Sequence, residues 1–457
     1  MLAHPFLAQR GQQGWLLSEY SDFDRMLTVY QQQLRGRRQR IMLLERAPIP
    51  WLAGFFAAVL ADCPLFLGNP YWGVTEAQQA IARSQPERIW GEIPAAWGWL
   101  APELASHNPA SSEAIIAIPT GGSSGTIRFA THTWATLAAA ARGFHAHFGD
   151  QPVNALNVLP LYHVSGLLPV VRSLLSGGRL ECFPYADLKA GRRPRLTPAD
   201  SFLSLVPTQL QTWLTLDAAG LQDWRAILVG GGPTWPRLLT AARQADLPLA
   251  LTYGATETAA QVATLQPWEF RAGRVDCGRS LPHAELQIWD AAGQVLPAAS
   301  VGAIAVRAPS LFHGYYPGSR SPDEFWLTGD WGRLDAAGHL TVLGRQDQTI
   351  ISGGEKVFPT EVEAAIRATG GVADVAVLGV PDAHWGQAVM ALCVRSEMVM
   401  SLEDLAAIIR PQLANFKQPK HWCWLPSLPR DARGKLNQKA LRAIATQALP
   451  SSQNLAR

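Results

Sequence analysis

The chain has 457 residues, of which 48% are hydrophobic and 16% charged, and its formal net charge is +3. This composition is typical of a folded α/β protein of roughly two to four domains, and it excludes a disordered or fibrous chain. The basic residues are neither clustered nor interleaved with aromatic ones, so the sequence predicts no nucleic-acid binding. The longest apolar run, residues 51–61, is too short to span a bilayer and predicts a buried helix.

The five cysteines lie far apart in the sequence and form no CxxC pair. They are Cys63, Cys182, Cys277, Cys393 and Cys423. This spacing implies neither a disulfide framework nor a zinc site, and it suits a reducing compartment. The first residues lack the basic start and apolar core of a signal peptide. We therefore expect a cytoplasmic protein without a membrane span.

Helix-like and strand-like stretches alternate along the chain, which predicts sheets covered by helices. We expect a helix over residues 55–61, then strands over residues 114–118 and 226–229. A run of short strands closes with residues 340–343. A new pattern follows, with a strand over residues 375–380 and a helix over residues 402–410 that Ser401 caps. These elements predict two domains, 1–346 and 347–457.

A glycine-rich segment directly follows the expected strand at residues 114–118. It reads Pro-Thr-Gly-Gly-Ser-Ser-Gly-Thr-Ile-Arg over residues 119–128. Its glycines let backbone N–H groups turn toward one anion, and its hydroxyl groups add further donors. It is not a P-loop, because no lysine follows the last glycine. The segment therefore predicts either a phosphate cradle or a flexible turn.

Two later segments end in an acidic residue. Residues 251–257 read Leu-Thr-Tyr-Gly-Ala-Thr-Glu, and the hydroxyl and carboxylate at their end suit Mg²⁺, which prefers oxygen ligands. Tyr253 could stack on a base, and the alternative is a strand end with a capping threonine. Residues 326–330 end in Asp330, which together with Arg345 could hold the hydroxyl groups of a ribose.

The last two segments lie in the second expected domain. Residues 352–363 read as a glycine turn that leads into a helix with acidic residues in its first turn. Residues 428–435 form a glycine-containing loop that presents Lys435. A compact ammonium group suits the charge that develops on a transferring phosphoryl group. The alternative is a solvated surface lysine.

Taken in this order, the five segments resemble the adenylate-forming superfamily, which includes acyl-CoA synthetases, adenylation domains of peptide synthetases and luciferase. The resemblance runs from about residue 45 to residue 439. It implies an α/β fold with a large N-terminal domain of helix-covered sheets, a small barrel-like subdomain, and a small mobile α+β C-terminal domain. It also implies that ATP, Mg²⁺ and coenzyme A take part and that the substrate is a small carboxylate.

The resemblance further implies roles for individual residues. The ATP phosphates would be bound by Thr120, Gly121, Gly122, Ser123, Ser124, Gly125, Thr126 and Arg128. The adenine side would be formed by Gly231, Gly232, Tyr253 and Gly254, and the ribose would be held by Asp330 and Arg345. Thr256 and Glu257 would contact the α-phosphate and Mg²⁺, and Lys435 would stabilise adenylation. Rotation about Asp347 would then remove Lys435 and bring Gly353 and Gly354 toward the tunnel where the thiol of coenzyme A arrives.

The glycine-rich segment departs from the family pattern at four positions. Gly121, Ser124, Ile127 and Arg128 stand where the family usually has serine, threonine, proline and lysine. Arginine keeps the positive charge of the lysine. The loss of the proline predicts a more mobile loop and puts its grip on ATP in doubt.

Within the superfamily, residues 204–210 and 159–166 resemble the 2-succinylbenzoate–CoA ligases of menaquinone or phylloquinone synthesis. His163 would then line or gate the acyl pocket, and the alternative is a packed histidine at a strand end. A dicarboxylate also needs a partner for its second, buried carboxylate. The candidates are Ser165, Thr208, Gln209 and Arg172. The alternative functions are a CoA ligase for another aryl or medium-chain acid, a peptide-synthetase adenylation domain, and a non-catalytic nucleotide-binding regulator.

Overall fold

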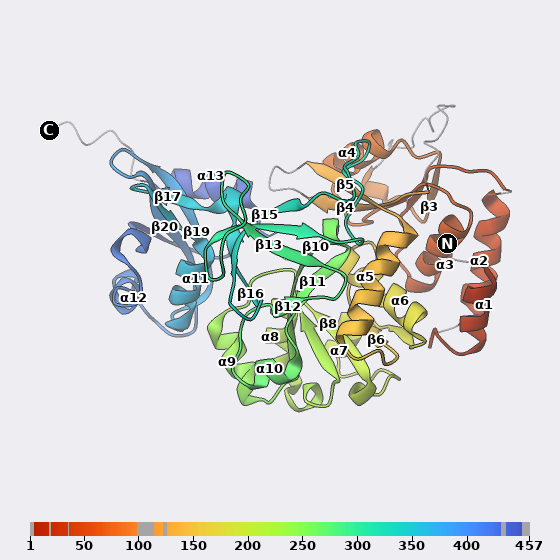
Figure 1. Ribbon diagram of the computed structural model, residues 1–457. Helices are drawn as coiled ribbons and strands as arrows, with labels where there is room; N and C mark the ends of the chain where they lie inside the picture. The colour runs from red at the N-terminus through yellow and green to blue at the C-terminus, as the bar shows by residue number, and fades with distance from the viewer. Residues whose placement is uncertain are drawn as a thin grey trace.

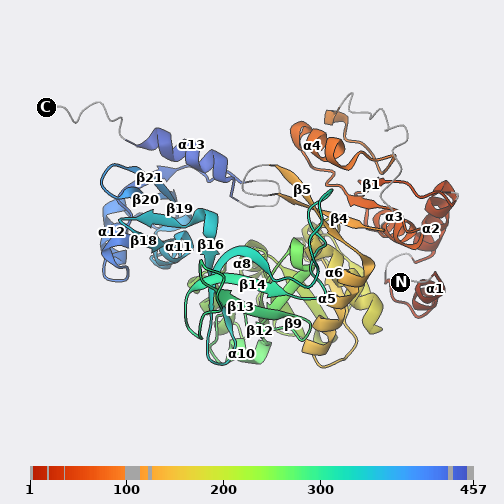
Figure 2. The ribbon, with the colours of Figure 1, turned by 45° about the horizontal axis from the view of Figure 1, so that its top comes forward.

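The computed structural model describes residues 4–17, 20–34, 36–97, 114–121, 126–430 and 436–449. Four β-sheets organise this part of the chain (Figures 1 and 2). Three of them form a large unit that ends with Arg345, and the fourth forms a C-terminal unit that starts at Ile350. No helix within these residues is both long and apolar enough to cross a membrane. The architecture is of the α/β class that the sequence predicts.

The first sheet has five strands in the order β3-β1-β2-β4-β5. They are β1 (Ile41–Leu43), β2 (Leu65–Leu67), β3 (Arg88–Trp90), β4 (Ile116–Gly121) and β5 (Ile127–His132), of which only β5 runs antiparallel to its neighbour. The helices of this part are α1 (His4–Gln12), α2 (Tyr20–Leu34), α3 (Pro48–Leu60) and α4 (Val74–Ser84). Helix α3 is buried from Trp51 to Ala58 because its side chains are apolar on every face. The buried helix expected around residues 51–61 is confirmed.

The second sheet has seven strands in the order β12-β11-β10-β9-β8-β6-β7. They are β6 (Asn154–Asn157), β7 (Leu180–Cys182), β8 (Ser201–Leu205), β9 (Ala226–Val229), β10 (Leu249–Ala255), β11 (Ala260–Thr264) and β12 (Arg279–Ser280). The helices are α5 (Trp134–His147), α6 (Val164–Ser176), α7 (Tyr185–Lys189), α8 (Pro207–Asp217), α9 (Pro236–Gln244) and α10 (Pro267–Arg271). Strands β6 to β10 are parallel, so the loops after β6, β8, β9 and β10 meet at one edge of the sheet.

The third sheet is an antiparallel arrangement of four strands where the sequence resemblance implies a barrel-like subdomain. It contains β13 (Glu285–Trp289), β14 (Gly302–Arg307), β15 (Trp326–Leu334) and β16 (Leu340–Arg345), in that order. A short 3-10 turn, Gln346–Gln348, connects it to the C-terminal unit. This turn covers the domain boundary that the sequence predicts.

The C-terminal unit packs helices against one mixed sheet. Its strands are β17 (Ile350–Ser352), β18 (Glu355–Val357), β19 (Val372–Asp382), β20 (Gly386–Arg395) and β21 (His421–Leu425). Its helices are α11 (Pro359–Ala368), α12 (Leu402–Ile409) and α13 (Gln438–Ala448). The Ser401 side chain accepts a hydrogen bond from the backbone N–H of Asp404, so the predicted cap of α12 is confirmed.

Candidate active site

The β4–β5 hairpin brings the two ends of the glycine-rich segment together. Thr120 lies opposite Arg128 and Gly121 lies opposite Ile127, so strand β4 extends three residues past the expected end at residue 118. This extension follows from the cross-strand pairing, which the sequence pattern does not reveal. Thr126 is exposed beside the second strand. Four residues expected to bind phosphate lie outside the described residues: Gly122, Ser123, Ser124 and Gly125.

Arg128 and Glu257 both contact the side chain of Tyr315. The Cζ atom of Arg128 lies 4.0 Å from the centroid of the Tyr315 ring, which is a cation–π geometry. The Tyr315 hydroxyl donates a hydrogen bond to Oε1 of Glu257 over 2.6 Å. The Nε atom of Arg128 is buried and has no hydrogen-bond partner among the described residues. Tyr315 thus joins a cation of the phosphate segment to the carboxylate expected to hold Mg²⁺.

Glu257 is held in a tight turn directly after β10. Thr256–Thr258 form a 3-10 turn, and Ala259 and Ala260 follow with φ angles of 53° and 74°, a conformation that costs energy for residues with a side chain. A Cβ atom at Gly254 would lie 1.9 Å from the carbonyl oxygen of Ala260, so only glycine fits there. The turn therefore presents the Glu257 carboxylate in one defined place.

The Glu257 carboxylate suits a metal ion that arrives with phosphate groups. Protein Mg²⁺ sites of this kind use one or two carboxylates, and the substrate phosphates and water complete the coordination. Within the part of the chain that the structure describes, no group of three or more His, Cys, Asp or Glu side chains could hold a metal. A single carboxylate beside the phosphate segment matches Mg²⁺ bound as its ATP complex.

His132 fixes the main chain beside Glu257. Its ring is fully buried, and Nε2 lies 2.8 Å from the carbonyl oxygen of Thr256. Because a carbonyl oxygen can only accept, Nε2 carries the proton. Burial lowers the pKa of His132 to about 4, so the ring is neutral at pH 7, and its Nδ1 lies 3.1 Å from the Thr136 hydroxyl oxygen. His132 is therefore a donor that holds the Thr256 carbonyl in place.

Asp330 and Arg345, the residues expected at the ribose, lie opposite each other on β15 and β16. Arg345 Nη1 donates to Oδ1 of Asp330 over 3.3 Å, and the Tyr253 hydroxyl donates to Oδ2 over 2.6 Å. Burial raises the pKa of the Asp330 carboxyl, and hydrogen bonds from Tyr253 and Arg345 oppose that rise. Arg345 Nε also pairs with Asp347 over 3.3 Å. The expected hinge residue is thus linked directly to the ribose pair.

The loop at residues 230–233 follows β9 at the same sheet edge as β10. A Cβ atom at Gly230 would lie 2.4 Å from Oγ1 of Thr252, and Gly231 has a φ of 77°. Both positions therefore favour glycine for a local reason. A Cβ atom at Gly232 would meet no other atom within 4 Å, so this position leaves open space at the expected adenine side.

The residues expected in the acyl pocket differ in the contacts that their side chains already make within the protein. His163 precedes α6 and its ring packs against Tyr162, with 4.6 Å between centroids. Ser165 and Thr208 are exposed near the starts of α6 and α8. Oε1 of Gln209 accepts the backbone N–H of Val206, which caps α8. This bond uses the amide oxygen of Gln209 and does not engage its amide nitrogen, which is the atom that could donate to a carboxylate.

Arg172 is the one of these candidates that carries a buried charge. Its side chain is 3% exposed, its Nη2 donates to Oε1 of Gln261, and its Cζ lies 4.0 Å from the centroid of the Phe144 ring. No carboxylate among the described residues pairs with it, and its Nε has no hydrogen-bond partner there. Burial lowers the pKa of Arg172 to about 9. The neighbouring His283 is half-buried, and desolvation of its ring together with the charge of Arg172 lowers its pKa to about 4.

Arg172 lies close to the nucleotide residues, although the sequence separates them widely. Gln261, which accepts from Arg172, lies opposite Gly254 in the β10–β11 pair. Helix α6, which carries Arg172, begins directly after His163. A buried guanidinium without an anionic partner is costly, so the burial of Arg172 favours a bound carboxylate.

The C-terminal unit touches the large unit beside the ribose pair. Lys356 Nζ lies 3.8 Å from the centroid of the Trp331 ring, and the Thr360 hydroxyl donates to the carbonyl oxygen of Leu343 over 2.6 Å. Lys435 lies outside the described residues, which resume after it at Leu436. Figures 1 and 2 both show α13 beginning on the side of the C-terminal unit that faces the β4–β5 hairpin.

Gly353 and Gly354 form the turn between β17 and β18. Their φ angles of 60° and 85° are those of a two-residue turn that favours glycine. A Cβ atom at Gly353 would lie 2.8 Å from the ring of Trp385, whose carbonyl oxygen accepts the Gly353 N–H. The expected tunnel loop is therefore a defined hairpin on the C-terminal unit.

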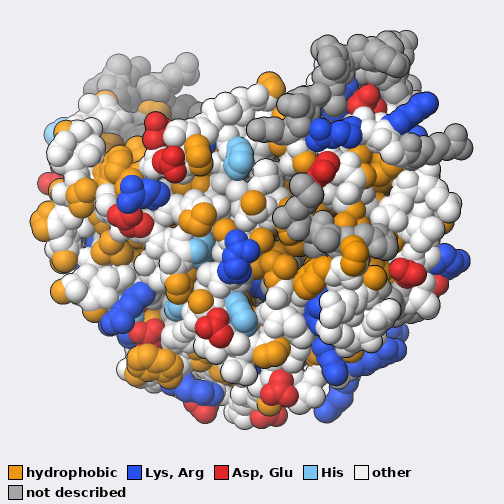
Figure 3. All heavy atoms as spheres, turned by 45° about the vertical axis from the view of Figure 1, so that its right-hand side comes forward, with side chains coloured by type: hydrophobic (Ala, Val, Ile, Leu, Met, Phe, Trp, Pro, Cys, Tyr) orange, Lys and Arg blue, Asp and Glu red, His pale blue; other side chains and the backbone are white. Residues whose placement is uncertain are grey.

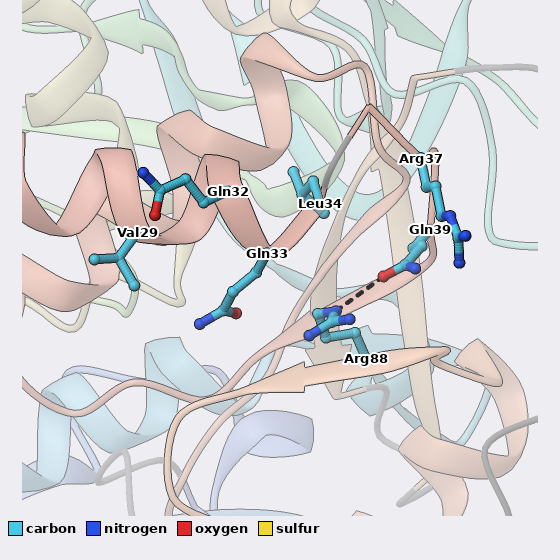
Figure 4. A pocket seen from close by; sticks show the side chains of 7 residues that line it. All are labelled: Val29, Gln32, Gln33, Leu34, Arg37, Gln39 and Arg88. Atoms are coloured by element: carbon cyan, nitrogen blue, oxygen red, sulfur yellow. Dashed lines mark hydrogen bonds between the residues drawn. The ribbon is translucent and has the colours of Figure 1, made fainter.

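A surface pocket of about 410 Å³ lies away from these residues (Figure 4). It is lined by Val29, Gln32, Gln33, Leu34, Arg37, Gln39 and Arg88. Arg88 lies on β3, which is the edge strand opposite β5 in the first sheet. Figure 3 shows hydrophobic side chains spread among charged and polar ones over another face of the molecule. None of the residues that line this pocket belongs to the candidate active site.

Two residues of the site, His132 and Tyr315, are not predicted by the sequence. His132 stands next to no recognised segment, and Tyr315 lies 58 positions after Glu257. The isolated backbone pairing of Ala130 with Tyr315 brings the second segment alongside β5. The sequence could have indicated Tyr315 only through a predicted pairing between its segment and β5.

Comparisons with known proteins match most of the chain. Residues 72–316 match the family model for AMP-binding enzymes, and residues 361–435 match the model for the C-terminal domain of AMP-binding enzymes. A 2-succinylbenzoate–CoA ligase of Enterococcus faecalis is 32% identical over 339 residues, which are 72% of this chain and 70% of that protein. One of Bacillus cereus is 32% identical over 345 residues, 73% of this chain and 71% of that protein.

Solved structures share the fold over nearly the full length. The o-succinylbenzoate CoA synthetase (MenE) of Bacillus subtilis, in complex with its acyl-adenylate intermediate, has a TM-score of 0.81 and 26% identity over 96% of this chain and 97% of that one. The same enzyme in complex with ATP and a magnesium ion has a TM-score of 0.78 and 26% identity over 95% of this chain and 98% of that one.

Proposed function

Because this chain belongs to the family of AMP-binding enzymes, we propose that it is an AMP-forming acyl-CoA synthetase that joins 2-succinylbenzoate to coenzyme A. In the first step a carboxylate oxygen of the acid attacks the α-phosphorus of ATP, and pyrophosphate leaves. In the second step the thiol of coenzyme A attacks the acyl carbon, and AMP leaves as the thioester forms. This chemistry belongs to the synthesis of menaquinone or phylloquinone.

The described residues support the first step. Asp330 and Arg345 bind the ribose hydroxyl groups, and Tyr253 orients the Asp330 carboxylate from the adenine side. Glu257 would hold Mg²⁺, and the ion would neutralise phosphate charge there. The glycine-rich segment from Thr120 to Arg128 holds the β- and γ-phosphates.

The arrangement of the two units supports adenylation. Helix α13 begins on the side facing the β4–β5 hairpin, and Lys435 precedes that helix by three residues. Lys435 stabilises charge on the phosphate during adenylation. The unit then rotates about Asp347, which removes Lys435 and brings Gly353 and Gly354 to the entry for coenzyme A.

The buried Arg172 is the observation that carries the choice of a dicarboxylate. An apolar pocket would suffice for a monocarboxylic aryl acid, whereas Arg172 supplies a positive charge that lacks an anion among the described residues. We assign Arg172 to the second carboxylate of 2-succinylbenzoate, with His283 beside it. Of the other candidates, Gln209, Ser165 and Thr208 could donate a hydrogen bond to that carboxylate but carry no charge to match it.

The test is a substrate panel with a matched pair of variants. With ATP, Mg²⁺ and coenzyme A, 2-succinylbenzoate should yield pyrophosphate, AMP and the thioester. Arg172→Met should raise the KM for 2-succinylbenzoate by more than about 100-fold, because breaking a buried charge pair costs about 3–5 kcal/mol. The exposed Arg142→Gln on α5 should leave it unchanged. No thioester from any aryl or fatty acid would refute the ligase assignment, and equal KM values in the Arg172→Met and wild-type proteins would refute the role of Arg172.

We also infer a cytoplasmic location, because both co-substrates, ATP and coenzyme A, are supplied there. All five cysteines are free, which suits a reducing compartment. Cell fractionation checks this, and recovery in an oxidising compartment would contradict it.

A further inference from the structure

The main chain of Tyr315 is fixed alongside the phosphate hairpin. The backbone N–H of Thr131 donates to the carbonyl oxygen of Gly314 over 2.9 Å, and the N–H of Tyr316 donates to that of Phe129 over 2.9 Å. Ala130 and Tyr315 form an antiparallel bridge between these two bonds. The segment around Tyr315 therefore acts as an added strand beside β5, and its backbone moves with the hairpin.

The side chain of Tyr315 reaches the two groups on which Mg·ATP binding depends. Its ring supports the guanidinium of Arg128 at 4.0 Å, and its hydroxyl donates to Oε1 of Glu257 at 2.6 Å. Burial raises the pKa of Tyr315, so the phenol stays protonated and remains a donor at neutral pH. Oε2 of Glu257 has no hydrogen-bond partner among the described residues and is left for a metal ion.

We propose that Tyr315 is a positioning residue that holds Arg128 and Glu257 in one arrangement for the metal and the outer phosphates of ATP. The inference rests on the proposed function, because it takes Glu257 as the Mg²⁺ ligand. A hydrogen bond to one carboxylate oxygen orients the other, and loss of such an outer partner typically weakens metal binding about 10- to 100-fold. The cation–π contact orients Arg128 in the same way, with a smaller effect.

The experiment compares the binding of Mg·ATP with the binding of AMP by calorimetry, in the absence of an acid substrate. AMP uses the ribose and adenine residues but lacks the outer phosphates and their metal. Tyr315→Phe should weaken Mg·ATP binding about 10-fold and leave the affinity for AMP unchanged. Tyr315→Leu, which also removes the ring under Arg128, should weaken Mg·ATP binding further. A general disturbance of the fold would instead weaken the binding of both Mg·ATP and AMP.

Tyr316→Phe is the matched control. Its ring packs against Phe66 at 5.0 Å, and its hydroxyl forms no hydrogen bond to the described residues. It should bind Mg·ATP as the wild type does. Rate measurements complete the test: Tyr315→Phe should slow adenylation but not the reaction of coenzyme A with a supplied acyl-adenylate.

The outcomes separate this inference from the proposed function. If the wild-type protein makes thioester but Tyr315→Phe binds Mg·ATP with wild-type affinity, the role of Tyr315 is refuted. If Tyr315→Phe weakens Mg·ATP and AMP equally, the role is also refuted, because the effect is then not confined to the metal and phosphates. If the wild-type protein binds Mg·ATP but activates no acid, the proposed function fails while the role of Tyr315 in binding stands.

Discussion

The nucleotide side of the large unit and the docking face of the C-terminal unit are held in different ways. On the nucleotide side, Glu257 and Asp330 are each bonded by a tyrosine hydroxyl at 2.6 Å, and the Thr256 carbonyl is held by the fully buried His132. Part-buried hydrogen bonds of this kind resist rearrangement because a polar group that loses its partner away from water is costly. The large unit therefore presents its ATP-binding residues in a fixed arrangement.

The docking face relies on contacts that lie partly in solvent. They include the Lys356–Trp331 cation–π contact, the Thr360 hydrogen bond to Leu343, and the Arg367 guanidinium 5.7 Å from the Trp235 ring. Exposed contacts of this type contribute roughly 0.5–1 kcal/mol each. The C-terminal unit is therefore attached more weakly than the groups of the nucleotide side are held, and this difference is compatible with the rotation about Asp347 that we propose.

The strongest loss of activity is expected from replacing Lys435, the residue of the C-terminal unit that is assigned to adenylation. Lys435→Ala should slow acyl-adenylate formation about 100- to 1,000-fold, since it removes a donor that acts on developing charge. The reaction of supplied acyl-adenylate with coenzyme A should change little, because the rotation that we propose removes Lys435 from the site before that step. Single-turnover measurement of pyrophosphate release and of thioester formation separates the two steps. Equal slowing of both would contradict the assigned role, and the exposed Lys439→Ala serves as control.

A second prediction concerns the buried framework of the large unit. The pKa of His132 is about 4 in the folded protein, below its ordinary value of 6.5, so the unfolded chain binds more protons between these values. The stability contributed by the neutral ring is present above pH 6.5 and is lost as the pH falls toward 4, by about 3 kcal/mol in total.

His132→Gln keeps an N–H donor for the Thr256 carbonyl but cannot titrate. Its free energy of unfolding should therefore fall less steeply than that of the wild type between pH 6.5 and 4, as measured by urea unfolding at several pH values. The pKa of His283 is also lowered to about 4, so its own contribution to the pH dependence of the free energy of unfolding should persist in this variant. The exposed His384→Gln should leave the pH profile unchanged, and an unchanged profile in His132→Gln would show that His132 does not titrate as inferred.

A third prediction tests the fixed ribose pair. Asp330→Asn removes the charge that strengthens the bonds from Tyr253 and Arg345 and to the ribose, and bonds to a charged group contribute about 1.5–3 kcal/mol. The KM for ATP should rise about 10- to 100-fold, while the KM for coenzyme A stays near the wild-type value. Steady-state kinetics with each substrate varied in turn gives both numbers. Asp323→Asn, an exposed change on the preceding loop, should alter neither; a wild-type KM for ATP in Asp330→Asn would remove Asp330 from the site.

The sequence predicts well those structural features that depend only on residues close together in the chain. Strand β9 coincides with the expected residues 226–229, and the Ser401 cap of α12 needs only the residues around it. The pairing of Asp330 with Arg345 is also accessible, because both lie on neighbouring strands separated by one turn.

The rest depends on contacts between distant segments. Tyr315 reaches Glu257 only because residues 313–316 pair with β5, and Arg172 reaches Gln261 only because α6 packs beneath β11. Nothing in the spacing of these residues reveals either contact. For the same reason the sequence leaves four candidates for the second carboxylate, whereas burial without an anionic partner distinguishes Arg172.

The weakest effect on activity is expected from removing the contact between Lys356 and Trp331 on the docking face. Lys356→Met keeps the length of the side chain but removes the charge over Trp331, so about 0.5–1 kcal/mol of the docked arrangement is lost. If that arrangement is the one competent for adenylation, adenylation should slow about two- to fivefold relative to thioester formation from supplied adenylate. Lys420→Met, exposed elsewhere on the same unit, should leave this ratio at the wild-type value. If Lys356→Met instead raises the rate of adenylation relative to that of thioester formation, the contact with Trp331 favours the thioester-forming arrangement. The arrangement seen in the structure would then be assigned to thioester formation and not to adenylation.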